Sequence, residues 1–222
     1  HVNGTQRLVD AAQGKIGRWV QLSSVGAYGA RRTGMITESS KEQPFGIYER
    51  TKTEADKIIK NSNIPYVILR PSNVFGVDMI NQSIFQLISM ISKGLFFYLG
   101  KKGVLVNYVA VEDVVEALHL CGNHDNALGE IYNVSQTIVI EEMVLSFSIG
   151  LGVKGKFLRL PEFPIRALVK IFAIFPKFPL TTTRIDALTN RCTYKSNKIM
   201  EELGFKFNST LKESFQLIAR KK

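Results

Sequence analysis

Cysteine and histidine are scarce in this sequence of 222 residues. The two cysteines, Cys121 and Cys192, lie far apart and form no Cys-x-x-Cys motif. A disulfide scaffold is therefore excluded, and a reducing, cytoplasmic setting is the simplest interpretation. None of the three histidines (His1, His119 and His124) has a second ligand at the spacing of a metal site, so we expect no bound metal.

Long uncharged apolar segments are missing as well. No stretch of 18 uncharged apolar residues occurs, so no membrane-spanning helix is expected. The nearest candidate, Phe163–Leu180, is interrupted by charged residues and prolines. Its charges recur at helical spacing, which favours a helix of a substrate-binding lobe over a membrane segment. The first residues lead directly into a helical pattern, so we expect no signal peptide in the chain.

Acidic residues are outnumbered, with 19 Asp and Glu against 29 Lys and Arg, which gives a net charge of +10. The basic residues are scattered rather than gathered into a stripe with interleaved aromatic residues. Their one dense run, Arg220–Lys222, is interpreted as a solvated tail. We therefore expect no nucleic-acid partner, whereas a phosphate-bearing substrate or cofactor suits the charge.

The sequence does contain an alternation of apolar strands and helices, and its length suits one or two domains. The segments expected as strands are Trp19–Leu22, Tyr66–Leu69, Asn107–Val111 and Glu130–Val134. The segments expected as helices are Thr5–Gln13, Phe45–Lys60 and Glu112–Cys121, with a loop over Ser23–Pro44. Strands separated by helices predict a parallel sheet that is covered on both faces.

From about Ile140 onward the pattern is mainly helical and ends with helices over Lys195–Leu203 and Thr210–Ala219. The sequence thus predicts an α/β sheet followed by a smaller, mainly helical lobe. A doubly wound dinucleotide domain opens with a strand, a glycine-rich turn and a helix. No such turn follows a strand in this sequence, so we expect two further strand–helix units, about 80 residues, ahead of His1.

Tyr48 and Lys52 are four residues apart in the expected helix over Phe45–Lys60, so they share one helix face. A lysine ammonium beside a phenol favours the phenolate form. Such a tyrosine can pass a proton to or from a carbinol oxygen while a nicotinamide cofactor gives or takes hydride. The pair is therefore a candidate for acid–base chemistry.

The sequence contains two further pairs with the same spacing, Tyr98/Lys102 and Tyr194/Lys198. The first pair runs through Gly100 into a glycine-flanked turn, which disrupts helical geometry. The second pair lies late in the chain, with no strand and serine-containing loop before it. Only Tyr48 and Lys52 follow such a strand and loop, so the context favours them.

The loop Ser23–Gly29 leaves the carboxyl end of the expected strand Trp19–Leu22, where open α/β sheets place their ligands. A serine hydroxyl there can donate a hydrogen bond to a substrate oxygen together with Tyr48. We therefore expect Ser24 to act in the site. Without Tyr48 and Lys52, an ordinary polar turn would be the better interpretation.

Five motifs stand in the order and spacing of a known family. They are Val2-Asn3-Gly4-Thr5, Ser23-Ser24-x-x-x-Tyr28-Gly29, Tyr48-x-x-x-Lys52, Leu69-Arg70-Pro71-Ser72-Asn73-Val74-Phe75-Gly76 and Tyr108-Val109-x-Val111-x-Asp113-Val114. In these motifs, and in the tail Tyr194-x-Ser196-x-Lys198-Ile199, the chain resembles the extended short-chain dehydrogenases/reductases over nearly its whole length. This is the family called NAD-dependent epimerase/dehydratase.

The resemblance implies an α/β fold with a partial Rossmann-type, doubly wound parallel sheet over residues 1–139. A smaller, mainly helical substrate-binding lobe would follow over residues 140–222, with segments exchanged around residues 76–105. The resemblance also implies NAD or NADP as the cofactor and a nucleotide sugar as the substrate. A homodimer would form through the opening helix and the helix of Tyr48 and Lys52.

Roles for single residues follow from the same resemblance. The catalytic residues would be Ser24, Tyr48 and Lys52. The residues at the nicotinamide end of the cofactor would be Tyr48, Lys52, Pro71, Ser72, Asn73 and Val74. The residues that contact the substrate would be Ser24 and Arg184, with Arg191 as the next candidate. Arg70 and Asp113 would be structural and Tyr28 a packing residue.

Two alternatives to a nucleotide-sugar enzyme stay open. The apolar segment Phe157–Leu180 would also suit an enzyme similar to 3β-hydroxysteroid dehydrogenases. A binding protein that kept the fold and lost its cofactor site is the alternative from another class, because a fold alone never establishes activity. Ser24, Tyr48 and Lys52 together argue against this loss, and the missing glycine-rich turn argues for it.

Overall fold

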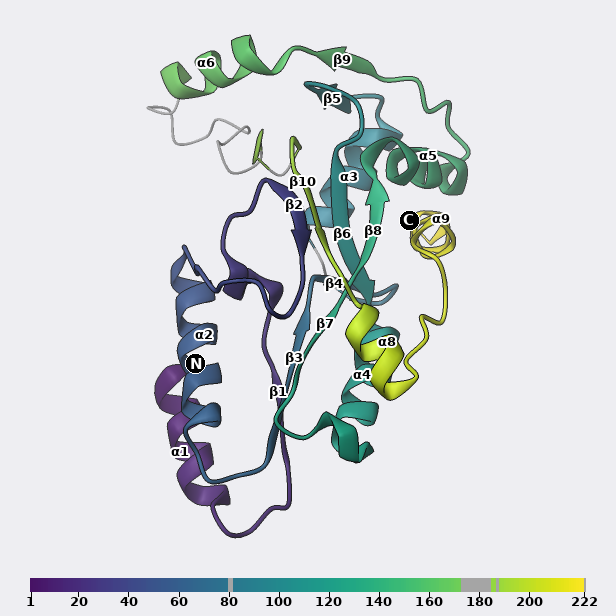
Figure 1. The fold of residues 1–222 in the computed structure, drawn as a ribbon. Coiled ribbons are helices and arrows are strands. Elements are labelled where there is room, and N and C mark those ends of the chain that lie inside the picture. The colour runs from purple at the N-terminus through teal and green to yellow at the C-terminus, as the bar shows by residue number, and fades with distance from the viewer. Residues whose placement is uncertain (80–81, 173–184, 187, 222) are drawn as a thin grey trace.

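A computed structural model of the chain describes residues 1–79, 82–172, 185–186 and 188–221. Its centre is a parallel sheet in the order β1 (Trp19–Leu22), β3 (Tyr66–Pro71) and β7 (Ile131–Val134). Residues 19–22 of β1 pair with residues 66–69 of β3, and residues 68–71 of β3 pair with residues 131–134 of β7. The predicted parallel α/β sheet is thereby confirmed (Figure 1).

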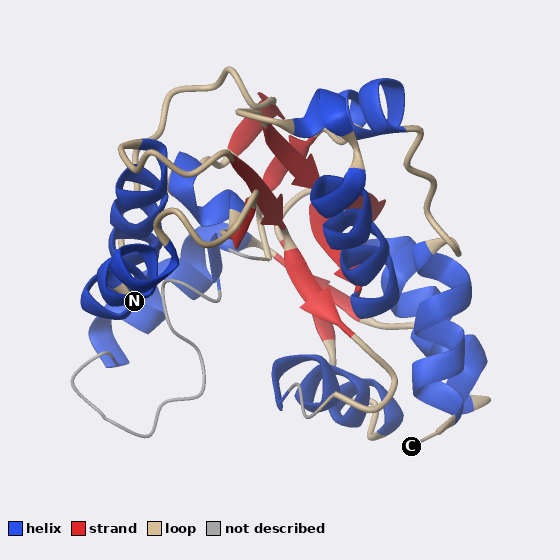
Figure 2. Ribbon diagram, turned by 90° about the horizontal axis from the view of Figure 1, so that it is seen from below, coloured by secondary structure: helices blue, strands red, loops and turns tan. Residues whose placement is uncertain are grey.

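Helices cover both faces of this sheet, as Figures 1 and 2 show. On one face lie α1 (Val2–Ala12) and α2 (Ile47–Lys60), and on the other lie α4 (Val111–Asn123) and α8 (Asn197–Leu203). Each pair buries apolar side chains against the strands, which is how amphipathic helices stabilise a sheet. Helix α8 thus packs beside β7, although 62 residues lie between these two elements in the sequence.

The strands continue beyond the central sheet into a second one, formed by β4 (Asn73–Phe75), β6 (Leu105–Ala110) and β8 (Gln136–Val139). β4 pairs with β6 in parallel, and β6 pairs with β8 in antiparallel orientation. β4 follows β3 after Ser72, and β8 follows β7 after Ser135. At each break the chain passes from the central sheet into the second sheet. The polar residues Ser72 and Ser135 therefore stand where the central sheet ends.

The predicted loop over Ser23–Pro44 contains two elements that sequence reasoning missed. A short 3-10 helix, η1 (Val25–Tyr28), follows β1 directly, and a strand, β2 (Thr33–Ile36), lies further along. β2 pairs in parallel with β10 (Arg191–Tyr194). The first three residues of β2 are exposed, so the strand shows no apolar alternation, and its partner lies more than 150 residues away in the sequence.

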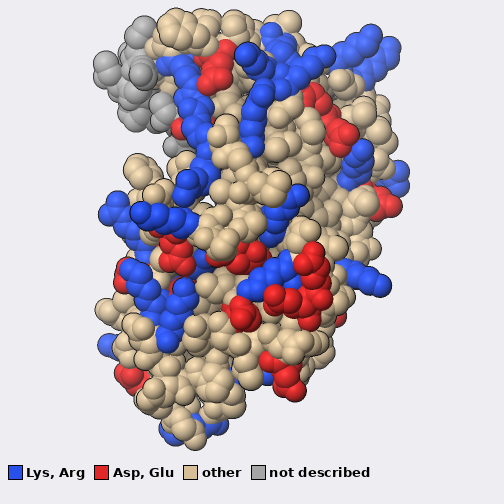
Figure 3. Space-filling model, viewed as in Figure 1, with Lys and Arg blue, Asp and Glu red and all other residues tan. Residues whose placement is uncertain are grey.

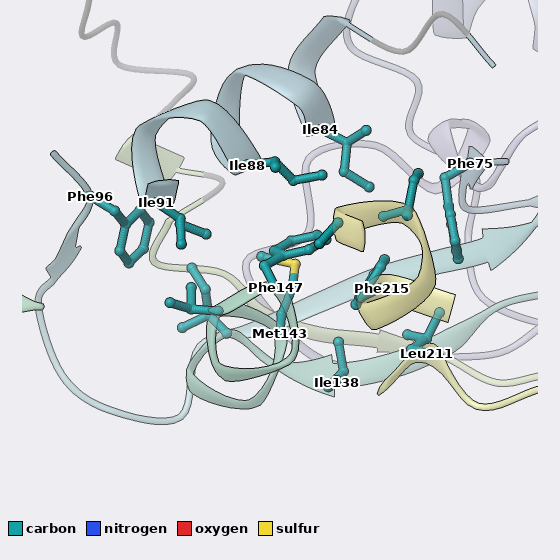
Figure 4. Packing of buried hydrophobic residues seen from close by; sticks show 14 of the residues in the cluster. Phe75, Ile84, Ile88, Ile91, Phe96, Ile138, Met143, Phe147, Leu211 and Phe215 are labelled. Atoms are coloured by element: carbon teal, nitrogen blue, oxygen red, sulfur yellow. The ribbon is translucent and has the colours of Figure 1, made fainter. Parts of the chain in front are cut away.

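A second layer of helices forms the lobe on the far side of β6 and β8. It consists of α3 (Gln82–Ser92), α5 (Ile140–Leu151) and α9 (Leu211–Arg220). They enclose the largest apolar cluster, in which Phe147 and Phe215 lie between Ile88 and Leu211 (Figure 4). Helix α9 begins with a capping box, because the Thr210 side chain and the Glu213 side chain each bond the other residue's backbone N–H.

The lobe is less purely helical than the sequence predicts. Two short strands, β5 (Phe97–Leu99) and β9 (Leu158–Leu160), pair in parallel, and helix α6 (Glu162–Phe172) follows β9. Helix α6 covers the first part of the predicted helix over Phe163–Leu180, and residues 173–180 lie outside the described ranges. In the described ranges, no helix combines the length and apolar character that crossing a membrane requires.

Candidate active site

The loop after β1 places two serines in different environments. The backbone N–H of Ser23 still donates to Leu69 of β3, so Ser23 extends the sheet, and its side chain is buried. Ser24 has an extended backbone and caps η1, because its Oγ accepts a hydrogen bond from the N–H of Gly26 at 3.1 Å. The Ser24 side chain thereby lies at the carboxyl end of the sheet and lines a cavity there.

Helix α2 brings Tyr48 and Lys52 to the same edge of the sheet. Tyr48 is 51% exposed and lines the cavity, and the ring of His1 meets its ring edge-on at 5.8 Å between centroids. The Lys52 ammonium donates a hydrogen bond to the carbonyl of Leu22, the last residue of β1, at 2.8 Å. The expected helix face is therefore directed to the end of β1, although Lys52 is not among the residues that line the cavity.

The break between β3 and β4 supplies the next wall. Ser72 is 8% exposed, and its hydroxyl has no hydrogen-bond partner among the described residues. Asn73 donates from its side-chain amide to the carbonyl of Asn107 at 3.1 Å. Both residues line the cavity. Pro71 and Val74 do not: Pro71 is buried at the end of β3, and Val74 packs against the apolar cluster under α4.

These residues enclose a cavity of about 610 Å³ between the sheet edge, α2 and the β10 strand. It brings together Ser24, Tyr48, Ser72 and Asn73, which come from three separate segments. Six further polar or aromatic lining residues were not expected from the sequence: Phe45, Glu49, Asn107, Tyr108, Asn190 and Tyr194. Glu49 lies within the Tyr48–Lys52 motif, Phe45 lies just before it, and Tyr108 and Tyr194 each open a family motif, whereas no local signal marks Asn107 or Asn190.

The three Tyr-x-x-x-Lys pairs differ in geometry. Tyr98 lies in β5, and the chain turns at Gly100 with a φ of 67° before Lys102, so that pair has no helical face. Tyr194 lies in β10, whereas Lys198 lies in α8 and forms an ion pair with Glu130. Tyr194 nevertheless lines the cavity, so the sequence argument was right to reject the pair but missed the tyrosine.

A buried polar network lies directly beneath the cavity and joins its walls. Ser23 donates to Asp56 at 2.7 Å, and the guanidinium of Arg70, which is fully buried, donates to Asp56 at 3.1 Å and to Glu42. Asp56 lies one turn after Lys52 on α2. The network therefore ties the ends of β1 and β3 to the helix that carries Tyr48.

Burial dominates the electrostatics of this network. Burial raises the pKa of Asp56, although the Ser23 hydrogen bond and the Arg70 charge work to lower it. For Glu42, burial works to raise the pKa, but the hydrogen bonds and charges of Arg70 and Lys60 together outweigh it, and the pKa is lowered. The ring of Tyr28 lies 5.0 Å from the Arg70 guanidinium, and its hydroxyl donates to Asn133 at 2.9 Å.

Two of the remaining candidates, Asp113 and Arg191, do not line the cavity. Asp113 accepts two hydrogen bonds from Asn208, at 2.8 and 3.0 Å, and so joins α4 to the segment before α9. Arg191 is exposed and donates to the carbonyl of Lys102, and Arg184 lies outside the described residues. No group of three or more His, Cys, Asp or Glu residues within the described ranges could hold a metal ion.

Residues 1–135 match the model of a family described as the NAD dependent epimerase/dehydratase family. The low-salt glycan biosynthesis protein Agl12 of Haloferax volcanii is 28% identical over 150 residues, which cover 64% of this chain and 48% of that protein. The human dTDP-D-glucose 4,6-dehydratase is 29% identical over 141 residues, which cover 60% of this chain and 40% of that protein. The matched segments thus span less than half of each curated relative.

Solved structures show the same fold. The crystal structure of UDP-glucuronic acid 4-epimerase from Bacillus cereus in complex with NAD has a TM-score of 0.70 to this chain at 18% identity. The alignment covers 96% of this chain and 64% of that chain. At this level of identity the likeness establishes the fold alone.

Proposed function

Because this chain belongs to the NAD dependent epimerase/dehydratase family, we propose that the protein transfers hydride between NAD or NADP and a carbinol carbon of a nucleotide sugar. One observation carries this proposal. The hydroxyls of Ser24, Tyr48 and Ser72 come from three segments and line one cavity at the carboxyl ends of parallel strands. Open α/β sheets bind their ligands at this edge.

The residues at this edge fit the nicotinamide end of a dinucleotide. The buried hydroxyl of Ser72 has no partner among the described residues, and a buried hydroxyl that bonds nothing is unfavourable unless a ligand meets it. Tyr48, Lys52 and Asn73 would hold this end together with Ser72, with Pro71 and Val74 behind them in the β3–β4 segment. When bound, the nicotinamide supplies a hydride donor or acceptor.

The side chains of the chain itself have distinct roles. Tyr48 exchanges a proton with the reacting oxygen of the substrate, and Ser24 donates a hydrogen bond to the same oxygen. Lys52 places a positive charge beside the end of β1, where it stabilises negative charge on nearby oxygens. Arg184 would contact the substrate from the lobe.

The lining of the cavity favours a sugar over a steroid. Hydroxyl, amide and carboxylate groups of Ser24, Glu49, Asn73, Asn107 and Asn190 line it. The amide of Asn107 already bonds Cys192 and Thr137, but the carboxylate of Glu49 and the remaining donors and acceptors of Ser24, Asn73 and Asn190 are open to the hydroxyls of a polyol, whereas a steroid has few groups to meet them. The nucleotide sugar is therefore the proposed substrate, and a 3β-hydroxysteroid is the second candidate because of the apolar character of Phe157–Leu180.

Two further expectations belong to this proposal. Helices α1 and α2 pack side by side, and Leu8 and Ile47 are exposed on them, which suits a homodimer through these helices. Cys121 and Cys192 are buried and unpaired, which suits a reducing compartment such as the cytoplasm.

The test is turnover by the full-length protein with UDP-glucose and NAD or NADP. We expect Tyr48→Phe to lower kcat by about 10²- to 10⁴-fold, the usual contribution of a positioned acid–base group, while cofactor affinity changes little. The matched control is Tyr98→Phe, because Tyr98 has the same spacing to a lysine but lies in β5, away from the cavity. Undiminished turnover by Tyr48→Phe would contradict the role of Tyr48.

The same assay separates the alternatives. Turnover of a 3β-hydroxysteroid without turnover of any nucleotide sugar would favour the steroid enzyme. Binding of a nucleotide sugar or dinucleotide without turnover of either substrate would favour a non-catalytic protein that kept the fold.

A further inference from the structure

The charge inside the cavity differs from the charge of the chain. The sequence carries a net charge of +10, and Lys and Arg side chains are spread over much of the face in Figure 3. Among the described residues that line the cavity, Glu49 is the only one with a charged side chain. The cavity of this basic chain is therefore marked by a single negative group.

Glu49 lies in the cavity wall beside Tyr48, against two glycines. A Cβ at Gly26 would come within 2.8 Å of the Glu49 Cγ, and a Cβ at Gly46 would come within 2.1 Å of its Oε2. Both glycines line the cavity. Their missing side chains leave the space that the Glu49 carboxylate occupies between the serine loop and the start of α2.

No cation neutralises Glu49 within the described part of the chain. The other acidic groups of α2 have partners: Glu54 pairs with Lys57, and Asp56 pairs with Arg70. The carboxylate of Glu49 has neither an ion pair nor a hydrogen bond to any described residue. The nearby cations of the site are directed to backbone carbonyls, Lys52 to Leu22 and Arg31 to Tyr28.

We propose that Glu49 selects the sugar: it accepts hydrogen bonds from the hydroxyls of an uncharged sugar ring and repels a ring that bears a carboxylate. This inference rests on the proposed function, because the reacting sugar must lie beside Tyr48. Hydrogen bonds to a carboxylate are stronger than those between neutral groups. Glu49 lies in the first turn of α2, where the helix dipole favours a negative charge. A second carboxylate in the same cavity would be destabilised by like-charge repulsion.

The test compares UDP-glucose with UDP-glucuronic acid in the full-length protein loaded with its cofactor. The two substrates share the nucleotide and the diphosphate and differ in the sugar carboxylate, so the ratio of their kcat/KM values isolates the effect of that group. We expect the wild-type protein to prefer UDP-glucose by about tenfold or more. Glu49→Gln, which keeps the shape of the side chain, should reduce this preference by about tenfold.

The matched control is Glu116→Gln, an exposed glutamate on α4 behind the opposite face of the sheet, and it should leave the ratio unchanged. An unchanged ratio in Glu49→Gln would overturn the proposal. So would an equal loss of turnover with both sugars, because Glu49 would then act in the chemistry itself. If the wild-type protein turns over neither sugar, the proposed function fails first, and this inference fails with it. Calorimetric binding of the two sugars to Tyr48→Phe should give the same preference without any turnover.

Discussion

Beneath the candidate active site, three segments are joined through buried charges, whereas the helices of the lobe pack mainly through apolar side chains, with an exposed ion pair between Lys212 of α9 and Glu142 of α5. In the first region, the fully buried Arg70 lies between Asp56 and Glu42. In the second, the rings of Phe147 and Phe215 lie 4.9 Å apart between α5 and α9 (Figure 4). The two regions of the molecule therefore depend on different forces.

The difference indicates which region stabilises the fold and which region positions the walls of the cavity. Burying apolar surface contributes about 25 cal/mol per Å², and it does so for many packings of similar shape. A buried ion pair gains little net stability, because desolvation offsets much of the attraction, but removing one partner leaves a charge unpaired. In the network, Nε and Nη1 of Arg70 and Oδ1 of Asp56 have no hydrogen-bond partner among the described residues. We conclude that the network positions the walls of the cavity and that the lobe stabilises the fold.

The largest expected effect on stability comes from the apolar region. Phe215→Ala should lower the free energy of unfolding by about 3–5 kcal/mol, because it removes a fully buried ring and leaves a cavity. The activity of the folded fraction should change little. Urea denaturation of the full-length protein measures the first quantity and initial rates the second. Leu217→Ala, at an exposed position of the same helix, is the control and should change stability by less than about 1 kcal/mol.

Arg70→Met tests the polar region and should have the next largest effect. The free energy of unfolding should fall by about 3 kcal/mol at neutral pH, because Asp56 remains buried without its cation. Turnover should fall by about 10- to 100-fold, because the segments that carry Ser24 and Tyr48 lose their common anchor.

The double variant Asp56→Asn/Arg70→Met decides whether charge is the cause. It should recover a large part of the lost stability, because no unpaired carboxylate remains. Equal losses in the single and the double variant would mean that Arg70 acts through its packing and not through its charge. A full loss of activity in Phe215→Ala with none in Arg70→Met would reverse the comparison between the regions.

The smallest expected effect is a difference in pH dependence within the network. Burial raises the pKa of Asp56, so the folded protein favours the protonated carboxyl. Its contribution to stability is therefore present below the ordinary pKa of about 3.9 and is lost as the pH rises through the raised pKa. Arg70 and Lys60 lower the pKa of Glu42 despite its burial, so the contribution of Glu42 to stability is present above about 4.3 and is lost as the pH falls.

Two variants check these opposite signs. Relative to the wild-type protein, Asp56→Asn should gain stability as the pH rises above about 4. Glu42→Gln should lose relative stability as the pH rises toward about 4.3 and should then stay level. Denaturation curves between pH 3 and 7 measure both. Parallel curves for the two variants would show that the two carboxylates do not titrate as their surroundings imply.

The sequence predicted the central sheet well, because its strands are short apolar runs between amphipathic helices. Trp19–Leu22 was predicted with its observed bounds, and the strand at Tyr66 extends only two residues further than expected. The strand β2 escaped prediction because it is exposed and pairs with residues 191–194. Local patterns report burial, and an exposed strand that depends on a distant partner has no local pattern.

For the candidate site, the sequence context selected Tyr48 and Lys52 among three pairs of equal spacing, because only this pair follows a strand and a serine-containing loop. The family resemblance suggested Ser72 and Asn73, which line the cavity, but also Pro71 and Val74, which do not. Asp56 was missed, although it follows Lys52 by four residues and so shares its helix face.

The sequence by itself determined the strands and helices of the central sheet, the family motifs, and the candidates for acid–base chemistry. These are properties of neighbouring residues, since periodicity and spacing act over one or two turns of chain. Only the tertiary structure decided that Asn107, Asn190 and Tyr194 line the same cavity as Tyr48, and that Glu49 is the one charged side chain among its described lining residues. Such residues become neighbours because distant strands pair. A local sequence pattern does not reveal this pairing, since its free energy depends on residues that are far apart in the chain.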